Sequence, residues 1–327
     1  MRILATLTLI VAAFAADAEC VGQNLINALP SDQRAALTIA ADAVPYPKGN
    51  LWRASKAGQT ITLIGTYHLG DPRHDAMFAL VASDLARATA LLVEAGPDEE
   101  AALKSYVASH PERLINQTGP TLPEALPKAD WLRLTDALRA RGIPSVFAAK
   151  LQPWYVSTLL AIPACQFDSA AARNGLDQRL MDAATARALP VMALEPYDTL
   201  FTIFDSFTAQ DQLTMLVQTL DAAAADEDMA ITLADSYFAG ENRLYWEFSK
   251  FQVRALSGVT KAEADREFAL VEEAMLNRRN RAWLPVITGA AAEGPLVVAF
   301  GALHLSGDQG VLNLLAQDGW TVASLTP

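Results

Sequence analysis

The sequence predicts an α/β fold with a central mixed β-sheet, flanking helices and a large helical insertion. Short apolar runs of strand length occur towards both ends of the chain and alternate with helix-length stretches, as in a sheet covered by helices. Two of these runs end in the same pattern, Gly-X-X-His, at residues 65–68 and 301–304. The chain contains only 4 histidines, so half of them share this one context.

The first 18 residues have the pattern of a secretory signal peptide. An apolar run from Ile3 to Ala13 follows Met1-Arg2 and leads into small residues, with cleavage expected after Ala18 or, alternatively, Ala15. The run is too short to be a good membrane anchor. We therefore predict a signal peptide over residues 1–18, an α/β domain over residues 19–327, and a periplasmic or secreted protein.

The two cysteines are predicted to form a disulfide. Cys20 and Cys165 are the only cysteines in the chain, and two cysteines in an oxidising exported compartment most often pair. Two unpaired thiols remain the alternative. Neither has a second cysteine or a histidine at metal-ligand spacing, which argues against a zinc knuckle.

Composition limits the partners. A net charge of −12 and a pI near 4.8 argue against nucleic acid or an anionic membrane surface as the main partner. Beyond the signal peptide, no run is long and apolar enough to cross a bilayer. A peptide or a small molecule is the expected partner, and the sequence leaves the oligomeric state open.

The first strands form a predicted β-β-α-β unit. Leu51–Ala54 and Gln59–Gly65 flank a glycine-containing turn and are typical of a hairpin. An apolar period from about Asp75 to Ala88 predicts a helix, and residues 90–94 predict the next strand. This strand ends in a carboxylate, Glu94.

The Ala-rich middle of the chain, from about residue 99 to residue 189, is predicted to be a series of short helices, because seven prolines interrupt it. Ser145–Phe147 is predicted to be a short strand within it. Gly175-Leu176-Asp177 opens a predicted helix that ends near Ala188. Residues 190–195 then predict a strand that again ends in a carboxylate, Glu195.

The last third begins with a predicted helical section from Ala209 to Ile287. A strand at residues 296–301, a helix at 309–317 and a closing strand at 321–325 complete the sheet. The pattern indicates one sheet with a helical insertion and does not indicate two independent domains.

The two repeated histidines are the main candidates for chemistry. In an open α/β sheet, ligands gather beyond the carboxyl ends of the strands, so His68 and His304 could converge on one pocket. Two imidazoles and one carboxylate, for which Glu94 is the best candidate, make a minimal hydrolytic metal site or an acid–base set. Taken singly, each residue could instead be structural, as a satisfied core histidine or a helix-capping glutamate.

Several familiar sites are absent from the sequence. It has no His-Glu-X-X-His, no Gly-X-Ser-X-Gly, no P-loop and no dinucleotide fingerprint. The other two histidines, His74 and His110, have polar neighbours typical of loops and are predicted to be exposed to solvent.

Taken together, the motifs resemble those of the TraB/GumN family, which is related to the Tiki proteases and more distantly to ChaN-like and erythromycin esterase-like proteins. The resemblance covers nearly the whole mature chain. It rests on both Gly-X-X-His motifs and on Val93-Glu94, Gly175-Leu176-Asp177, Leu194-Glu195, Arg279-Asn280, Trp283 and Cys20-Val21-Gly22.

The resemblance implies an α/β fold whose histidines and glutamate meet at one pocket and, for Tiki relatives, a metal-dependent peptidase activity. By position, His68, Glu94 and His304 would be the metal or acid–base set, with Arg279 and Asn280 as further catalytic residues. Arginine can hold a substrate carboxylate or an oxyanion. Arg279 could equally be a helix-surface residue.

We therefore expect an exported hydrolase in which His68, Glu94 and His304 hold a divalent ion such as Zn, Mn or Co. One alternative keeps hydrolysis without a metal and uses a histidine as general base. Another is an envelope protein that binds haem, a peptide or a glycan without turnover.

Overall fold

The structure is a computed structural model that describes residues 20–167, 174–255 and 260–325. The predicted signal peptide, residues 1–18, lies outside the described residues. A mixed sheet of six strands in the order β4-β3-β5-β2-β1-β6 forms the centre, as predicted. The strands are β1 Leu51–Lys56, β2 Gln59–Thr66, β3 Ala90–Val93, β4 Val191–Ala193, β5 Leu296–Gly301 and β6 Thr321–Ser324.

The strands that precede the candidate residues are parallel neighbours. β5 lies between β2 and β3, with Thr66 paired to Gly301 on one side and Val93 paired to Ala299 on the other. The three strands therefore end at the same edge of the sheet, and whatever follows them in sequence begins there.

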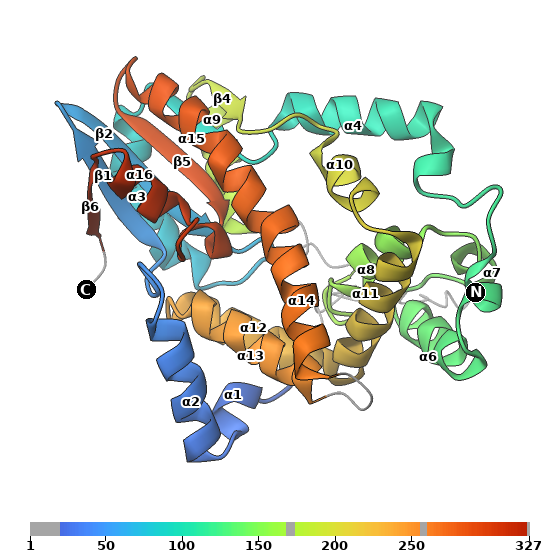
Figure 1. Ribbon diagram of the computed structural model, residues 1–327. Coiled ribbons are helices and arrows are strands. Elements are labelled where there is room, and N and C mark those ends of the chain that lie inside the picture. The colour runs from blue at the N-terminus through green and yellow to red at the C-terminus, as the bar shows by residue number, and fades with distance from the viewer. Residues whose placement is uncertain (1–19, 168–173, 256–259, 326–327) are drawn as a thin grey trace, which may run out of the picture.

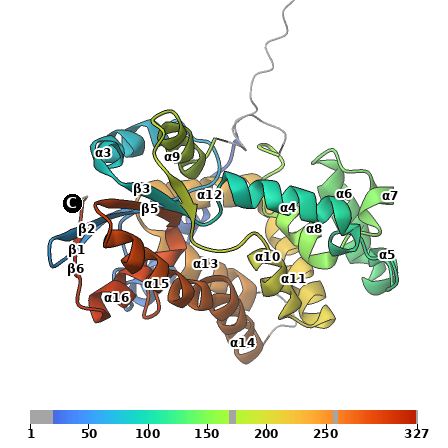
Figure 2. The same cartoon turned by 90° about the horizontal axis from the view of Figure 1, so that it is seen from above.

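Helices cover both faces of the sheet (Figure 2). On one face, α3 and α9 bury Val81, Leu85 and Leu180 against the apolar strands. On the other face, α15 and α16 bury Trp283 and Leu312. These four helices are α3 His74–Arg87, α9 Leu176–Thr185, α15 Arg278–Ala291 and α16 Val311–Gln317. Burial on both faces explains why the central strands are continuous apolar runs.

The helical insertion lies beside the sheet (Figure 1). The helices α4 to α8, α10 and α11 form one group, and α12 and α13 pack with the N-terminal α1 and α2. Their bounds are α1 Leu25–Ala28, α2 Ser31–Asp42, α4 Pro97–Ser109, α5 Leu122–Ala125, α6 Lys128–Arg139, α7 Ser145–Ala148, α8 Pro153–Leu160, α10 Thr199–Asp205, α11 Ala209–Ala222, α12 Asp226–Phe238, α13 Asn242–Arg254 and α14 Lys261–Glu272. Within the described ranges, no helix is both long and apolar enough to span a bilayer.

The β1–β2 hairpin forms as predicted. Its turn places Ala57 at φ 50° and Gly58 at φ 84°, both in the left-handed region. Positive φ at both central residues is the geometry that joins two twisted strands through two residues, and glycine adopts it without strain.

The predicted strand Ser145–Phe147 is wrong, because these residues form the helix α7, Ser145–Ala148. Pro144 immediately precedes this helix, and its carbonyl accepts hydrogen bonds from the amides of Phe147 and Ala148. The side chains of Val146 and Phe147 are 75% and 68% exposed. Val146 and Phe147 therefore imitate the apolar pattern of a strand, although they are exposed to solvent.

α14 continues into α15 through a single π-helical turn, Glu273–Asn277. The extra residue per turn rotates the helix that follows, and such insertions are common at functional sites. Arg279 lies directly after this turn, on the first turn of α15.

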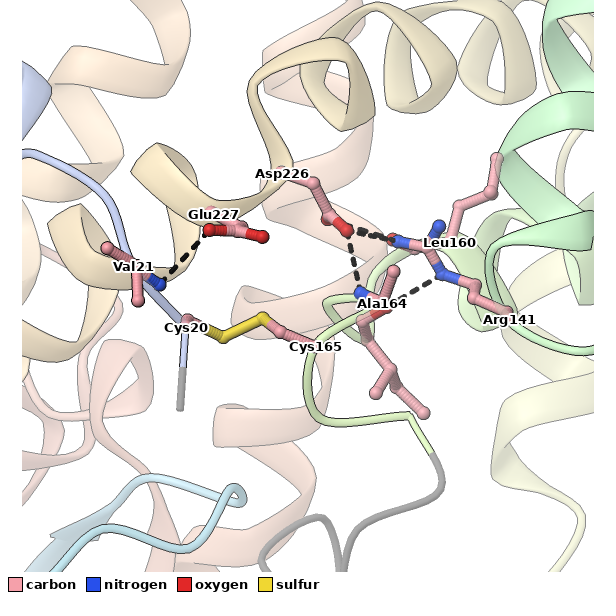
Figure 3. The surroundings of a disulfide bond; sticks show 9 residues. Cys20, Val21, Arg141, Leu160, Ala164, Cys165, Asp226 and Glu227 are labelled. Carbon is pink, nitrogen blue, oxygen red and sulfur yellow. Dashed lines mark hydrogen bonds and ion pairs between the residues drawn. A yellow bond between two sulfur atoms is a disulfide. The ribbon is translucent and has the colours of Figure 1, made fainter. Parts of the chain in front are cut away.

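The predicted disulfide between Cys20 and Cys165 is confirmed (Figure 3). It joins the N-terminal segment to the loop after α8. The carboxylates of Glu227 and Asp226 hold the two sides of this junction by accepting hydrogen bonds from the amides of Val21 and Ala164, respectively.

Candidate functional site

The ends of β2, β3 and β5 bring the three main candidate residues together. Glu94 follows the last residue of β3 directly, and His68 lies two residues beyond β2. His304 ends a short 3-10 turn, Ala302–His304, that continues from β5. All three therefore begin at the edge of the sheet where the parallel strands end.

Gly301 marks the point around which the three side chains gather. A Cβ atom at this glycine would lie 3.3 Å from Glu94 Oε1, 3.6 Å from His68 Nε2 and 3.8 Å from His304 Cδ2. The missing side chain thus leaves a small space bounded by one carboxylate and two imidazoles.

Glu94 is held as a charged group. Its Oε1 accepts a 2.6 Å hydrogen bond from the backbone amide of Gly301, and its Oε2 lies 2.5 Å from Arg279 Nη2. Burial alone would raise the pKa of Glu94, but the Arg279 guanidinium, the His68 imidazole and this amide lower it below its ordinary value. The carboxylate is ionised at neutral pH.

His304 is buried and neutral. Asn280 Nδ2 donates to the carbonyl of Gln309 at 2.8 Å, so its Oδ1 faces His304 Nδ1, 2.5 Å away, and the ring must carry its proton on Nδ1. Nε2 is then unprotonated and accepts a 3.2 Å hydrogen bond from Arg279 Nη1. Burial is the main reason that the pKa of His304 falls to about 3.

His68 differs from His304 because its side chain is 61% exposed. Its Nδ1 lies 3.2 Å from Asp177 Oδ2. Desolvation would lower the pKa of His68, an effect that this exposure limits, and Asp177 and Glu94 raise it to about 9. Solvent also screens these charges, but the direction of the shift favours a protonated ring.

Gly175 allows α9 to approach His68 closely. A Cβ atom at Gly175 would lie 2.2 Å from the carbonyl oxygen of His68, and the amide of Leu176 donates to the carbonyl of Tyr67 at 3.1 Å. Asp177 follows on the first turn of α9. The Gly-Leu-Asp sequence thus fixes both the backbone and the ring of His68.

Arg279 connects the carboxylates of the site. Its Nε and Nη2 contact Glu195 at 2.8 and 2.7 Å, in addition to the contact with Glu94, and its side chain is 12% exposed. Trp283 Nε1 donates to Glu195 Oε2 at 3.0 Å. The structure therefore places Arg279 in the site and away from the helix surface.

This arrangement of two Gly-X-X-His motifs around one glutamate occurs within a stretch that a known family model matches. The model of the TraB/PrgY/gumN family matches residues 50–324. The chain belongs to this family. The matched residues include all six strands and every side chain of the candidate site.

Two curated relatives of this TraB/PrgY/gumN chain share one name. They are "Uncharacterized protein YbaP" from Escherichia coli strain K12 and from Shigella flexneri. Each is 26% identical over 257 residues, which cover 77% of this chain and 86% of the relative. The similarity therefore extends over most of both proteins.

Three residues at the site of this TraB/PrgY/gumN protein had no role predicted from the sequence. These are Asp177, Glu195 and Gly301. Glu195 carried the same signal as Glu94, a carboxylate directly after an apolar strand. Gly301 could not be recognised as more than a turn residue, because its importance lies in the space that it leaves empty.

The predicted exposure of His74 is wrong. The side chain is fully buried, its Nε2 lies 2.9 Å from the carbonyl of Leu69, and it packs against Tyr237 and Phe238. His110 is half-buried and stacks on Tyr106 with ring centroids 4.2 Å apart. Polar neighbours in sequence did not reveal that Tyr237 and Phe238 of the distant helix α12 cover the His74 ring, or that Tyr106, one turn earlier, stacks on His110.

The donor set at Gly301 does not form a closed metal site. His304 Nε2 and Glu94 Oε1 are 4.0 Å apart. In the part of the chain that the structure describes, no three His, Cys, Asp or Glu side chains are grouped closely enough to hold an ion. Arg279 contacts both Glu94 and His304, so an ion would have to displace its guanidinium.

Proposed function

We propose that this protein is an exported, metal-dependent hydrolase of peptidase type, with His68, Glu94 and His304 at its centre. The observation that carries the proposal is the space above Gly301, which two imidazoles and an ionised carboxylate surround within 3.3 to 3.8 Å of one point. Nitrogen and carboxylate ligands of this kind are what Zn, Mn and Co accept.

The surroundings of the two histidines support a metal. Each imidazole has its Nδ1 next to a side-chain oxygen, that of Asp177 for His68 and that of Asn280 for His304. Nε2 of His68 then lies on the side of Gly301, whereas Nε2 of His304 faces Arg279 and lies 4.0 Å from Glu94 Oε1. Oxygen partners on the far nitrogen of a ligand histidine fix the ring and strengthen it as a donor.

A divalent ion would be held by Nε2 of both histidines and by the Glu94 carboxylate; His68 would release its Nε2 proton, and the Arg279 guanidinium would move away from His304 Nε2. Such an ion would lower the pKa of a bound water to about 7, which would make hydroxide available at neutral pH. Arg279, fixed by Glu195, has N–H donors suited to a substrate carboxylate or to the oxyanion that forms when a carbonyl is attacked.

The alternative is a metal-independent hydrolase that uses a histidine as general base. It is less well supported with His304 as that base. A general base works best with a pKa near the operating pH, and the pKa of His304 is lowered to about 3. A neutral ring whose Nε2 is unprotonated and bound only by the Arg279 hydrogen bond suits a metal ligand better than a base. The exposed edge of His68 leaves the centre accessible to a peptide or a small molecule.

Export to the periplasm or the cell exterior is part of the proposal. The Cys20–Cys165 disulfide supports an oxidising compartment. Residues 1–18 would then be the signal peptide, removed before the mature protein folds.

Metal analysis paired with a cleavage assay tests the proposal. We expect the purified mature protein to contain close to one equivalent of Zn, Mn or Co and to cleave members of a peptide library. His68→Ala should abolish both properties. His110→Ala, a histidine substitution outside the site, is the matched control and should retain them.

Chelation separates the alternatives. Metal-free protein that keeps full activity would contradict the metal and leave the general-base hydrolase. Protein that binds haem with a Soret band and cleaves no peptide would contradict hydrolysis and favour the binding function.

A further inference from the structure

A second hollow lies in the helical part of the molecule, between α11, α13 and α14. Its volume is about 500 Å³, which is within the range of small-molecule sites. None of the side chains gathered around Gly301 contributes to its wall. The hollow is therefore separate from the proposed hydrolase centre.

The wall of the hollow is largely apolar and adaptable. Phe207, Met215, Met229, Phe268 and Val271 contribute to it. Methionine side chains rotate freely and adjust to ligands of different shape. An apolar ligand would therefore be favoured over water in this space.

The charged groups of the wall all have one sign. Asp211, Asp221 and Glu267 line the hollow, and no Lys, Arg or His is among the described residues of its wall. Arg133 neutralises Asp221 at 2.5 Å. Asp211 accepts hydrogen bonds from Thr208 at the start of α11.

Glu267 is one of two carboxylates of the wall that form no ion pair among the described residues, the other being Asp211, which is held by Thr208. Gln218 Nε2, a neutral amide, donates to its Oε2 at 2.5 Å. Over the described residues, Glu267 has no ion pair with a basic side chain. A carboxylate at the wall of an apolar space attracts a cationic group, because the low dielectric strengthens their interaction.

We propose that this hollow is a binding site for a hydrophobic amine, a ligand with an apolar body and one cationic nitrogen. The body fills the space between α11, α13 and α14, and the nitrogen lies at the Glu267 carboxylate. The same wall disfavours an anion of equal size, since it would bring two negative charges together.

Three ten-carbon probes test the site. Decylammonium, decanol and decanoate share one apolar body and differ in charge, and their binding to the mature protein can be measured by titration calorimetry below their micelle concentrations. We expect decylammonium to bind at least about tenfold more tightly than decanoate, with decanol between them.

Two substitutions assign the binding to the hollow. Glu267→Gln should bring the affinities of decylammonium and decanol together, whereas Glu293→Gln, the same change at an exposed position outside the hollow, should leave the preference intact. Val271→Trp should fill the space and remove binding of all three probes. Ala222→Leu serves the same purpose if Val271→Trp does not fold, as judged by circular dichroism.

Three results would overturn the proposal: no binding of decylammonium, equal affinity for decylammonium and decanoate, or binding that both filling substitutions leave unchanged. Cleavage activity is not part of the readout, so failure of the hydrolase proposal would leave this test unaffected.

Discussion

The two glycines of the Gly-X-X-His motifs have different functions at the scale of single residues. A Cβ at Gly65 would lie 2.6 Å from a Leu305 methyl and 2.9 Å from Ala302, so this glycine lets the end of β2 pack against the turn after β5. A Cβ at Gly301 would instead occupy the space between Glu94 and His68. One glycine serves packing, and the other keeps the candidate centre open.

Gly301→Ala should therefore damage the centre and spare the fold. Its φ of −51° is open to any residue, and the new methyl group would meet Glu94 Oε1 at 3.3 Å. We expect metal content and cleavage to fall at least about tenfold, with a change in unfolding free energy of less than about 1 kcal/mol. Metal analysis, kinetics and urea unfolding measure these three quantities.

Two other glycines are controls for this substitution. Gly65→Ala should cost about 1 to 3 kcal/mol of stability through overpacking. Gly289→Ala in α15, where a Cβ would meet nothing within 4 Å, should be neutral or slightly stabilising. Full activity in Gly301→Ala would show that the space has no role.

Asp177 should control the protonation of His68. Asp177→Asn removes the negative charge 3.2 Å from Nδ1, so the pKa of His68 should fall from its raised value. Two-dimensional NMR titration of the metal-free protein measures this pKa directly. If the ring is a metal ligand, affinity should also fall by about 10- to 100-fold. An unchanged pKa would mean that the contact is absent in solution.

At the scale of elements, α3 and α9 together hold the segment that carries His68. Gly175, at the start of α9, packs closely against the backbone carbonyl of His68. The buried ring of His74, at the start of α3, contacts the carbonyl oxygen of Leu69 through Nε2. Arg73 adds ion pairs to Asp71 and to Asp235 of α12. Contacts from α3 and α9 therefore fix the segment between β2 and α3.

This role of His74 predicts a dependence of stability on pH. Burial lowers the pKa of His74 in the folded protein below its ordinary value of about 6.5, with a further contribution from Arg179. The unfolded chain then binds the proton more readily, so the contribution of His74 to stability is complete above about pH 6.5 and is lost as the pH falls below it.

Urea unfolding between pH 7 and pH 5 measures the effect. Wild type should lose stability over this range with a slope of up to about 1.4 kcal/mol per pH unit from this group. His74→Gln should have a smaller slope, and His110→Gln should match wild type. Equal slopes for wild type and His74→Gln would contradict the prediction.

The π-helical turn Glu273–Asn277 acts at the same scale. It directly precedes the first turn of α15, from which Arg279 and Asn280 reach the site while Trp283 packs over His304 at 4.4 Å. The orientation of α15 thus positions the guanidinium, the amide and the indole together.

At the scale of the whole molecule, the Cys20–Cys165 disulfide closes a loop of 145 residues that contains β1, β2, β3 and much of the helical insertion. The loss of freedom that it imposes on the unfolded chain corresponds to roughly 4 to 5 kcal/mol in the chain-entropy model. Its position links the N-terminus to the chain that leads towards α9 and Asp177.

Cys20→Ser combined with Cys165→Ser should therefore lower stability by up to about 5 kcal/mol without moving the site residues. Urea unfolding of the double variant, with and without reductant, measures this loss, and reductant should affect only wild type. A double variant as stable as oxidised wild type would show that the bond adds nothing to the fold.

Much of this architecture followed from local patterns. The apolar runs marked β2, β3 and β5, and the proline spacing marked the short helices of the insertion. The predictions for Ser145–Phe147 and His74 were wrong for one reason, because burial depends on distant parts of the chain. Val146 and Phe147 stay exposed to solvent, whereas residues of α12 bury the ring of His74. The same limit applies to Asp177 and Glu195, whose partners are 109 and 84 residues away in sequence.

The sequence by itself determined the sheet, the disulfide partners and the three residues at the ends of the strands, because strand period, cysteine number and motif repetition are local properties. Only the tertiary structure decided which imidazole is buried and neutral and which is exposed and paired with a carboxylate. Burial and charge depend on every atom nearby, and those atoms come together only when β2, β3, β5, α9 and α15 meet at one edge of the sheet.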